Sequence, residues 1–195
     1  THDQVEAMTM ATRIAIMANG RLQQVGTSEE VYDTPTNVFV ARFIGTPPMN
    51  TFDGTVAADR SSVAVTHVDD LAVEATVAPE SMEVASDEAP TVTLPDALRA
   101  VVEPGQKVIV GIRPEHLAIA DPAAPDAPAG GVLRGRVRTE EWLGHEAVVL
   151  VDVAGATLAV RQKASAPIPG PDQAVGLLPE VDRLHLFDPN TTDRL

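Results

Sequence analysis

The chain has 195 residues, no cysteine and a formal net charge of −14 at pH 7. Nucleic-acid binding depends on basic side chains that neutralise phosphates, so the acidic charge argues against it, and against binding to anionic membrane surfaces. No apolar run approaches the ~20 residues that span a bilayer. The lack of cysteine excludes a disulfide framework and fits a cytoplasmic protein.

The first predicted element is a helix that begins after Asp3. This aspartate can cap the helix, and Glu6, three residues later, would complete a capping-box-like pair. Val5, Met8 and Ala11 then recur at a three-residue spacing, which predicts that they lie along one side of the helix.

A β-hairpin is predicted after this helix. Residues 14–17 and 22–25 each form a short apolar run that is typical of a strand. Asn19-Gly20 lies between them, and this dipeptide favours a type I′ turn because both of its residues accept positive φ.

Two short helices are expected to follow the hairpin. Thr27 and Glu30 have the spacing of a capping box, and Pro35 stops the helix that they begin. Asn37 can cap the next helix, which ends at Gly45. The apolar residues of this last helix recur at helical spacing: Phe39, Val40, Phe43 and Ile44.

Pro47-Pro48 mark a boundary, after which the hydrophobic period changes from helical to two. The strands expected beyond it are residues 52–58, 62–68, 71–77, 91–94, 107–113, 132–139, 147–153, 157–161, 173–178 and 184–187. Between them, residues 80–90 are acidic and poorly patterned, and residues 121–131 are a Pro/Ala/Gly-rich segment expected to form an exposed loop. Many short strands predict a mainly β fold, a small barrel or a sandwich.

The first fifty residues contain the segments "THDQVEAMTMA", "RIAIM", "GRLQQVGT", "EEVYDTP" and "NVFVARFIGTPPMN". Together they resemble the end of the ATP-binding subunit of carbohydrate-importing ABC transporters, of the maltose and sn-glycerol-3-phosphate type. Thr12 stands where that family usually has an acidic residue, a change expected to have little effect at the surface. No G-x-x-x-x-G-K-[ST] sequence is present, so the chain lacks a phosphate-binding loop. The missing loop and the start at Thr1 together suggest that the chain is the C-terminal portion of a longer protein.

Three later motifs also resemble this family. "GIRPEH" (residues 111–116), "EEWLGHE" (140–146) and "LHLFD" (184–188) are similar to segments of its accessory domain. The resemblance implies two parts. Residues 1–48 would be the α/β remnant that closes an ABC nucleotide-binding domain, and residues 49–195 a regulatory β-barrel of the OB/MOP (TOBE) type.

His2 is the candidate catalytic and cofactor-binding residue. It precedes the Asp3 cap, beside a helix N-terminus, where unpaired N–H groups favour anions such as phosphate. From its position alone, a solvent-exposed residue without a function is the commoner outcome. The resemblance implies that His2 is the switch histidine, which contacts the γ-phosphate of ATP in the intact subunit.

Other candidates have simpler explanations. Arg113 and Glu115, in "GIRPEH", are expected to form a structural pair. His116 could bind a metal beside Glu115, but nothing in the sequence completes a ligand set, so no metal site is predicted. The serines have no nucleophile-elbow setting, so a hydrolase triad is not expected.

The remaining candidates lie in the second half of the chain. Arg134, Arg136 and Arg138 alternate along one strand face, which allows either oxyanion binding or a solvated face paired with acids. Trp142, the single tryptophan, is expected in the core or at an interface rather than as a platform for a sugar.

The resemblance implies how the intact subunit works. Two copies would sandwich two ATP molecules with Mg²⁺, and closure of this homodimer would drive transmembrane permease subunits that receive a solute from an external solute-binding protein. The subunit would be cytoplasmic and peripheral on the inner face of the plasma membrane, with no direct membrane insertion and no nucleic acid. The chain alone is expected to bind no cofactor and to be inactive.

The alternative is a stand-alone β-barrel module that binds an oxyanion or a sugar. The packing of the first fifty residues distinguishes the two interpretations. The edge of a larger domain would expose apolar side chains, whereas a self-sufficient module would bury them.

Overall fold

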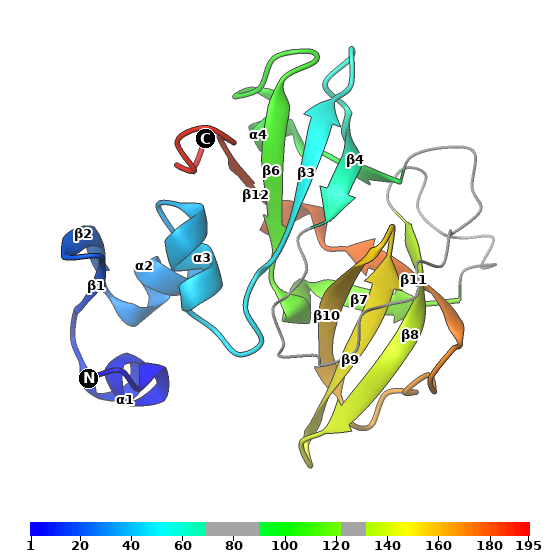
Figure 1. Cartoon of the computed structure of the whole chain (residues 1–195), viewed down its shortest axis with the longest axis horizontal. Helices are drawn as coiled ribbons and strands as arrows, with labels where there is room; N and C mark the ends of the chain where they lie inside the picture. The colour runs from blue at the N-terminus through cyan, green and yellow to red at the C-terminus, as the bar shows by residue number, and fades with distance from the viewer. Residues whose placement is uncertain (69–89, 122–131) are drawn as a thin grey trace.

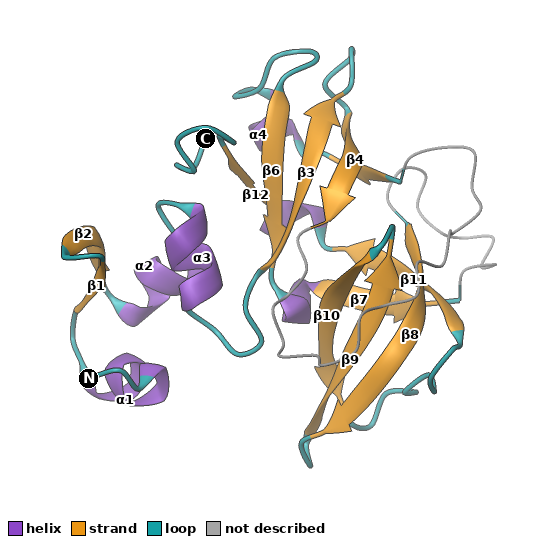
Figure 2. Ribbon diagram, viewed as in Figure 1, coloured by secondary structure: helices purple, strands orange, loops and turns teal. Residues whose placement is uncertain are grey.

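The computed structural model describes residues 1–68, 90–121 and 132–195 (Figure 1). The strand expected at 71–77 and nearly all of the segments 80–90 and 121–131 lie outside the described residues. Within the described part, two five-stranded antiparallel sheets follow a small N-terminal segment of helices and one hairpin (Figure 2). The expected mainly β fold is confirmed.

The N-terminal segment, residues 1–48, contains five short elements. They are α1 (Gln4–Met10), β1 (Ile14–Ala18), β2 (Arg21–Gly26), α2 (Ser28–Asp33) and α3 (Val38–Phe43). Strands β1 and β2 pair through a turn in which Asn19 and Gly20 have φ of 49° and 74°. Both values are positive, as a type I′ turn requires, so the predicted hairpin is confirmed.

The predicted caps of the later helices form as expected. The side chain of Thr27 accepts the Glu30 N–H, and the Thr27 N–H donates to the Glu30 carboxylate at 2.8 Å, which completes the capping box of α2. Asn37 caps α3 by accepting the Val40 N–H at 2.9 Å. These bonds satisfy N–H groups that have no partner within a helix.

The prediction for α1 is only half correct. Asp3 accepts the Glu6 N–H, but its own N–H donates to the Thr1 hydroxyl, so Glu6 does not complete a box. Val5 is 72% exposed and Ala11 lies beyond the helix end, so the expected apolar side was wrong.

The orientation of α1 is set by the hydrogen bonds of two polar side chains. The Gln4 amide bonds to the backbone of Phe43 and Gly45, and the Ser28 hydroxyl donates to the Met8 carbonyl. Positions three and four residues apart share a helix face. The Gln4 bonds therefore turn Ala7 and Met8, rather than Val5, toward the neighbouring helices.

Beyond residue 48, the chain forms the two sheets. The first sheet has the order β12-β6-β3-β4-β5 and comprises β3 (Asn50–Val56), β4 (Ser62–Val68), β5 (Thr91–Thr93), β6 (Lys107–Ile112) and β12 (His185–Phe187). The second has the order β10-β9-β8-β11-β7 and comprises β7 (Leu117–Ala120), β8 (Leu133–Trp142), β9 (Glu146–Val153), β10 (Ala156–Lys163) and β11 (Ala174–Pro179). Strand β12, from the C-terminal part of the chain, pairs with β6 and forms one edge of the first sheet.

Four short elements were not anticipated from the sequence. They are β7, α4 (Asp96–Arg99) and the 3₁₀ turns η1 (Pro114–His116) and η2 (Val181–Arg183). None of them is longer than four residues, which is too short for a hydrophobic period to be recognised. Strand β7 exists because its backbone pairs with β11, about sixty residues later in the chain.

Both sheets contribute to one main core, which is built mostly from valine and leucine and includes the fully buried Phe52. A buried polar bridge also joins them. Asn50, on β3, is fully buried, and its amide donates to the Ala159 carbonyl at 2.9 Å and accepts the Ala159 N–H at 2.8 Å. Both polar atoms of the amide are therefore satisfied, as burial requires.

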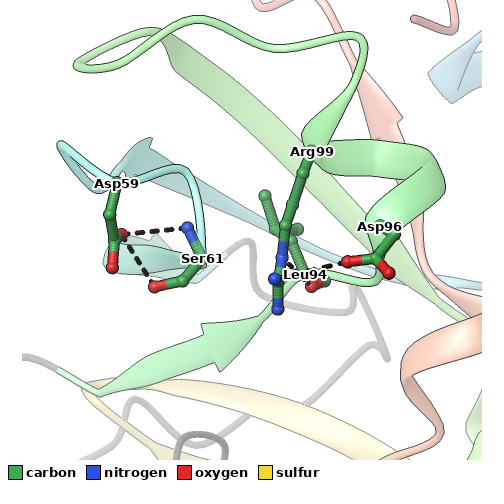
Figure 3. A network of polar contacts seen from close by, with 5 residues as sticks. All are labelled: Asp59, Ser61, Leu94, Asp96 and Arg99. Atoms are coloured by element: carbon green, nitrogen blue, oxygen red, sulfur yellow. Dashed lines mark hydrogen bonds and ion pairs between the residues drawn. The ribbon is translucent and has the colours of Figure 1, made fainter.

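Polar contacts also organise the far end of the first sheet (Figure 3). After β3, Asp59 accepts both the N–H and the hydroxyl of Ser61, and these bonds lower the pKa of Asp59. Arg99, in α4, donates from its Nε to the Leu94 carbonyl at 2.7 Å, and its Nη1 lies 3.3 Å from Asp96 Oδ1. Ser61 is thus a turn residue whose hydroxyl is bonded to Asp59.

Candidate functional site

His2 is exposed and precedes the Asp3 cap of α1, where the sequence analysis expected it. Within the described residues, its ring forms no hydrogen bond with another side chain or with the backbone. The helix behind it has only seven residues. Its contact with a γ-phosphate therefore remains a prediction.

The best-defined polar site lies where the N-terminal segment meets the sheets, and we call it the joint (Tyr32, Ile44, Arg113 and Glu115). Arg113 follows β6, is only 2% exposed, and crosses to two helices of the N-terminal segment. Its Nη1 donates to the Ile44 carbonyl at 2.7 Å, and its Nε and Nη2 both donate to the Tyr32 carbonyl. These carbonyls lie at the C-terminal ends of α3 and α2, where helices lack internal acceptor partners.

The Tyr32 side chain completes the joint. The carbon at the centre of the Arg113 guanidinium lies 3.6 Å from the centroid of the Tyr32 ring, a cation–π contact. The Tyr32 hydroxyl donates to the carboxylate of Glu115, in η1. Burial, together with this bond, raises the pKa of Tyr32 to about 12, so the hydroxyl stays protonated and remains a donor.

The expected pairing of Arg113 with Glu115 was wrong. Among the described residues no ion pair joins the two side chains; each of them contacts Tyr32 instead. Gly45 is needed here as well: its φ is +114°, and an added Cβ would come within 3.0 Å of Arg113 Nη1. Nothing in the local pattern indicated Tyr32 as the partner, since it lies 81 residues before Arg113.

A second arginine ties the other sheet to the same region. Arg161, on β10, donates to the Thr46 carbonyl at 3.1 Å, and its Nε lies 3.0 Å from a Glu146 carboxylate oxygen. Both sheets are thus fastened to the segment that precedes Pro47-Pro48.

The N-terminal segment has a small hydrophobic core of its own, formed by Ile14, Ile16, Val31, Val40 and Ile44. Among the described residues, eleven large apolar side chains are exposed, and seven of them precede residue 50: Val5, Met10, Met17, Leu22, Val25, Phe39 and Phe43. The last two stack on each other with ring centroids 5.4 Å apart. Apolar exposure is therefore concentrated in this segment.

The arginine face on β8 is largely occupied by internal partners. Arg138 Nε lies 2.9 Å from an Asp152 carboxylate oxygen, and Arg136 donates to the Asp172 carbonyl at 2.9 Å. Arg134 is exposed. The solvated and internally paired alternative thus fits this face better than an oxyanion site.

Two other candidates are resolved by their surroundings. His116 contacts Glu180 at 2.9 Å rather than Glu115, and within the described ranges no group of three or more His, Asp and Glu side chains could hold a metal ion. Trp142 is 69% exposed at the end of β8, beside the exposed Leu143. It is therefore not a core residue.

Next to the joint is a cavity of about 150 Å³ with a mostly polar lining. His185, the first residue of β12, lines it. Burial, together with the fields of Arg194, Arg113, His116 and Arg183, lowers the pKa of His185 to about 4. His185 is therefore neutral at pH 7.

The pKa of His185 predicts an acid-dependent loss of stability. In the unfolded chain this histidine takes up a proton below about pH 6.5, whereas in the folded chain it does so only near pH 4. The free energy of unfolding should thus fall by roughly 3 kcal/mol as the pH drops from 6.5 to 4. Urea unfolding between pH 7 and 4 should show a shallower decline for His185→Gln than for the wild type. Equal slopes would contradict this assignment.

The comparisons with known proteins were consistent with one another. Residues 45–117 match the MalK OB fold domain, and residues 110–187 match the TOBE domain. Among the described residues, no helix combines the length and apolar character needed to cross a membrane.

Three relatives illustrate the similarity. The chain is 38% identical over 191 residues to the trehalose/maltose import ATP-binding protein MalK of Thermococcus litoralis, covering 98% of this chain and 46% of that protein. It is 35% identical to the sn-glycerol-3-phosphate import ATP-binding protein UgpC 1 of Rhizobium johnstonii (98% and 44%). It is 34% identical to the diacetylchitobiose uptake system ATP-binding protein MsiK of Streptomyces coelicolor (100% and 49%).

The chain spans about half the length of these curated relatives. Among solved structures, the cytoplasmic molybdate-binding protein ModG is similar to 72% of this chain, with 20% identity and a TM-score of 0.46. At this level, the match has no bearing on the choice of ligand.

Proposed function

We propose a function on one premise: this chain is a MalK-type OB-fold and TOBE region, with its N-terminal flank, of the kind found at the C-terminal end of ABC importer ATP-binding subunits. In this proposal it is the regulatory portion of a subunit that couples ATP binding and hydrolysis to the uptake of a sugar or related solute. Residues 1–48 close the nucleotide-binding domain, and residues 49–195 form the regulatory domain.

One observation carries the division into two parts: the apolar exposure of the N-terminal segment. A region of fifty residues that keeps a small core yet holds seven of the eleven exposed large apolar side chains among the described residues has the surface of a domain edge. The MalK OB match begins at residue 45, close to the proposed boundary. This distribution favours the subunit over a stand-alone binding module.

In this proposal the chain contributes a single residue to the nucleotide site. It has no phosphate-loop sequence, and of its residues only His2 is proposed to reach ATP. ATP and Mg²⁺ would be held by other parts of the intact subunit, and His2 would contact the γ-phosphate from the start of α1. Apart from the contact of His2, the chemistry of hydrolysis would thus lie outside this chain, and its coupling to the regulatory domain would pass through the joint.

The partners follow from the same proposal. The intact subunit would act as a homodimer on the cytoplasmic face of the membrane, bound to transmembrane permease subunits that receive solute from an external binding protein. The solute itself would be selected by those partners, because no sugar site is apparent among the described residues.

The simplest test is the ATPase activity of the 195-residue chain. With Mg²⁺ and ATP, we expect no hydrolysis above that of buffer, whereas the intact subunit should hydrolyse ATP under the same conditions. Metal-dependent turnover by the chain alone, abolished by EDTA and retained after a second purification, would contradict the proposal.

A further inference from the structure

The cavity beside the joint lies at the meeting point of four chain segments. Asp33 ends α2, Arg113 and His116 lie in and beside η1, Arg183 and His185 belong to η2 and β12, and Arg194 is next to the last residue. Figure 1 shows the C-terminal end of the chain beside β12, next to the N-terminal helices.

Basic side chains converge on this cavity. Arg113, Arg183 and Arg194 line it, and all three, together with His116, are close enough to His185 to lower its pKa. Asp33 opposes part of this charge: burial lowers the pKa of Arg113, and the field of Asp33 acts in the opposite direction. Asp182 is the other acid of the lining.

Two of these arginines have no partner for their guanidinium groups among the described residues. All the Arg113 donors in the joint point to backbone carbonyls. In contrast, within residues 1–68, 90–121 and 132–195, the guanidinium groups of Arg183 and Arg194 form no hydrogen bond and no ion pair. The chain has 28 acidic residues and 14 basic ones. With acids in such excess, two arginines that line one cavity without an acidic partner are unexpected. Three arginines against two aspartates leave the lining positive.

We infer that this cavity binds a small oxyanion, with Arg183 and Arg194 as its charged donors and the His185 ring as an additional polar contact. Guanidinium groups match the geometry of phosphate, sulfate and carboxylate oxygens through paired N–H donors. A volume of about 150 Å³ has room for several water molecules. This is enough for an inorganic oxyanion or for the head group of a small metabolite.

Such an anion would bridge the C-terminal end of the chain to the joint. It would neutralise the converging cations and hold η2 and Arg194 against the end of α2, where Asp33 and Tyr32 lie. The binding requires only the 195-residue chain and does not depend on an ATP site elsewhere in the subunit.

The test is calorimetric titration of the 195-residue chain with sulfate and with inorganic phosphate, at constant ionic strength balanced by chloride. The wild type should bind one anion per chain. Arg183→Ala/Arg194→Ala should weaken binding about tenfold or more, as expected for the loss of charge-assisted hydrogen bonds. Because both side chains are exposed, this variant should fold, and its circular dichroism and thermal midpoint check that it does.

A matched control separates the site from general charge effects. Arg21→Ala/Arg134→Ala also removes two exposed arginines, away from the cavity, and should change the affinity less than about twofold. Absence of saturable binding to the wild type, equal losses in both double variants, or full binding by Arg183→Ala/Arg194→Ala would each overturn the inference.

A last comparison distinguishes the sources of the anion. Glycerol phosphate and citrate are titrated beside inorganic phosphate under the same conditions. Binding of one organic anion about tenfold tighter than phosphate would identify a metabolite head group as the ligand. Equal affinities, again lost in Arg183→Ala/Arg194→Ala, would identify a free inorganic oxyanion.

Discussion

Replacing Arg113 with alanine is expected to lower the free energy of unfolding by roughly 3 to 5 kcal/mol. The substitution leaves the buried carbonyl of Ile44 and the partly buried carbonyl of Tyr32 without their donors, and each orphaned group that is buried costs about 1–3 kcal/mol. It also removes the contact between the guanidinium and the Tyr32 ring, worth about 0.5–2 kcal/mol. Urea unfolding of the purified chain measures the total.

The destabilisation caused by Arg113→Ala should be greatest in one part of the chain. Because the joint fastens two helices to the sheets, hydrogen exchange should accelerate chiefly in α2 and α3. Arg113→Lys keeps the charge but not the fork of donors, so it should recover less than half of the loss. Arg134→Ala, an exposed control, should change stability by less than about 0.5 kcal/mol. A loss below about 1 kcal/mol for Arg113→Ala would contradict the role of the joint.

Replacing His2 with alanine in the intact subunit is expected to reduce ATP hydrolysis and coupled transport about 100-fold or more. A preorganised donor beside a reacting oxyanion typically contributes 10²–10³ in kcat. The fold should be unaffected, because His2 is exposed and lies before the helix. Hydrolysis by the purified subunit and uptake in reconstituted vesicles measure the two effects.

The control and the kinetic pattern make the His2 prediction specific. A general loss of nucleotide binding would raise KM, whereas a γ-phosphate contact made in the transition state lowers kcat with KM little changed. Thr12→Ala, at an exposed position just after α1, should behave as wild type. Unchanged hydrolysis in His2→Ala would remove this residue from the mechanism.

The signals that predicted local structure correctly all act over a few residues. The Thr27–Glu30 capping box, the Asn37 cap and the Asn19-Gly20 turn each depend on contacts within three positions. The error in α1 has the opposite origin. Its spacing of apolar residues is ambiguous over two turns, and the choice between faces is made by Gln4 and Ser28 through contacts 20 to 41 residues away.

The candidate site shows the same division. Residues 111–116 were recognised from their motif, yet the partner of Arg113 was wrongly assigned to Glu115, its neighbour in sequence. The cavity was not anticipated at all, since its lining comes from Asp33, His116, Arg183, His185 and Arg194. No pattern in a single segment brings such residues together.

The sequence by itself determined the composition of the core, the caps and turns, the period-two strands, and the family that its motifs resemble. These properties depend on residue type and on neighbours along the chain. The tertiary structure alone decided that Arg113 joins two helices to a sheet, that β12 forms the edge of that sheet beside β6, and that Arg183 and Arg194 share a cavity with His185. Such contacts join residues many positions apart, and their energy arises only when folding removes both partners from water.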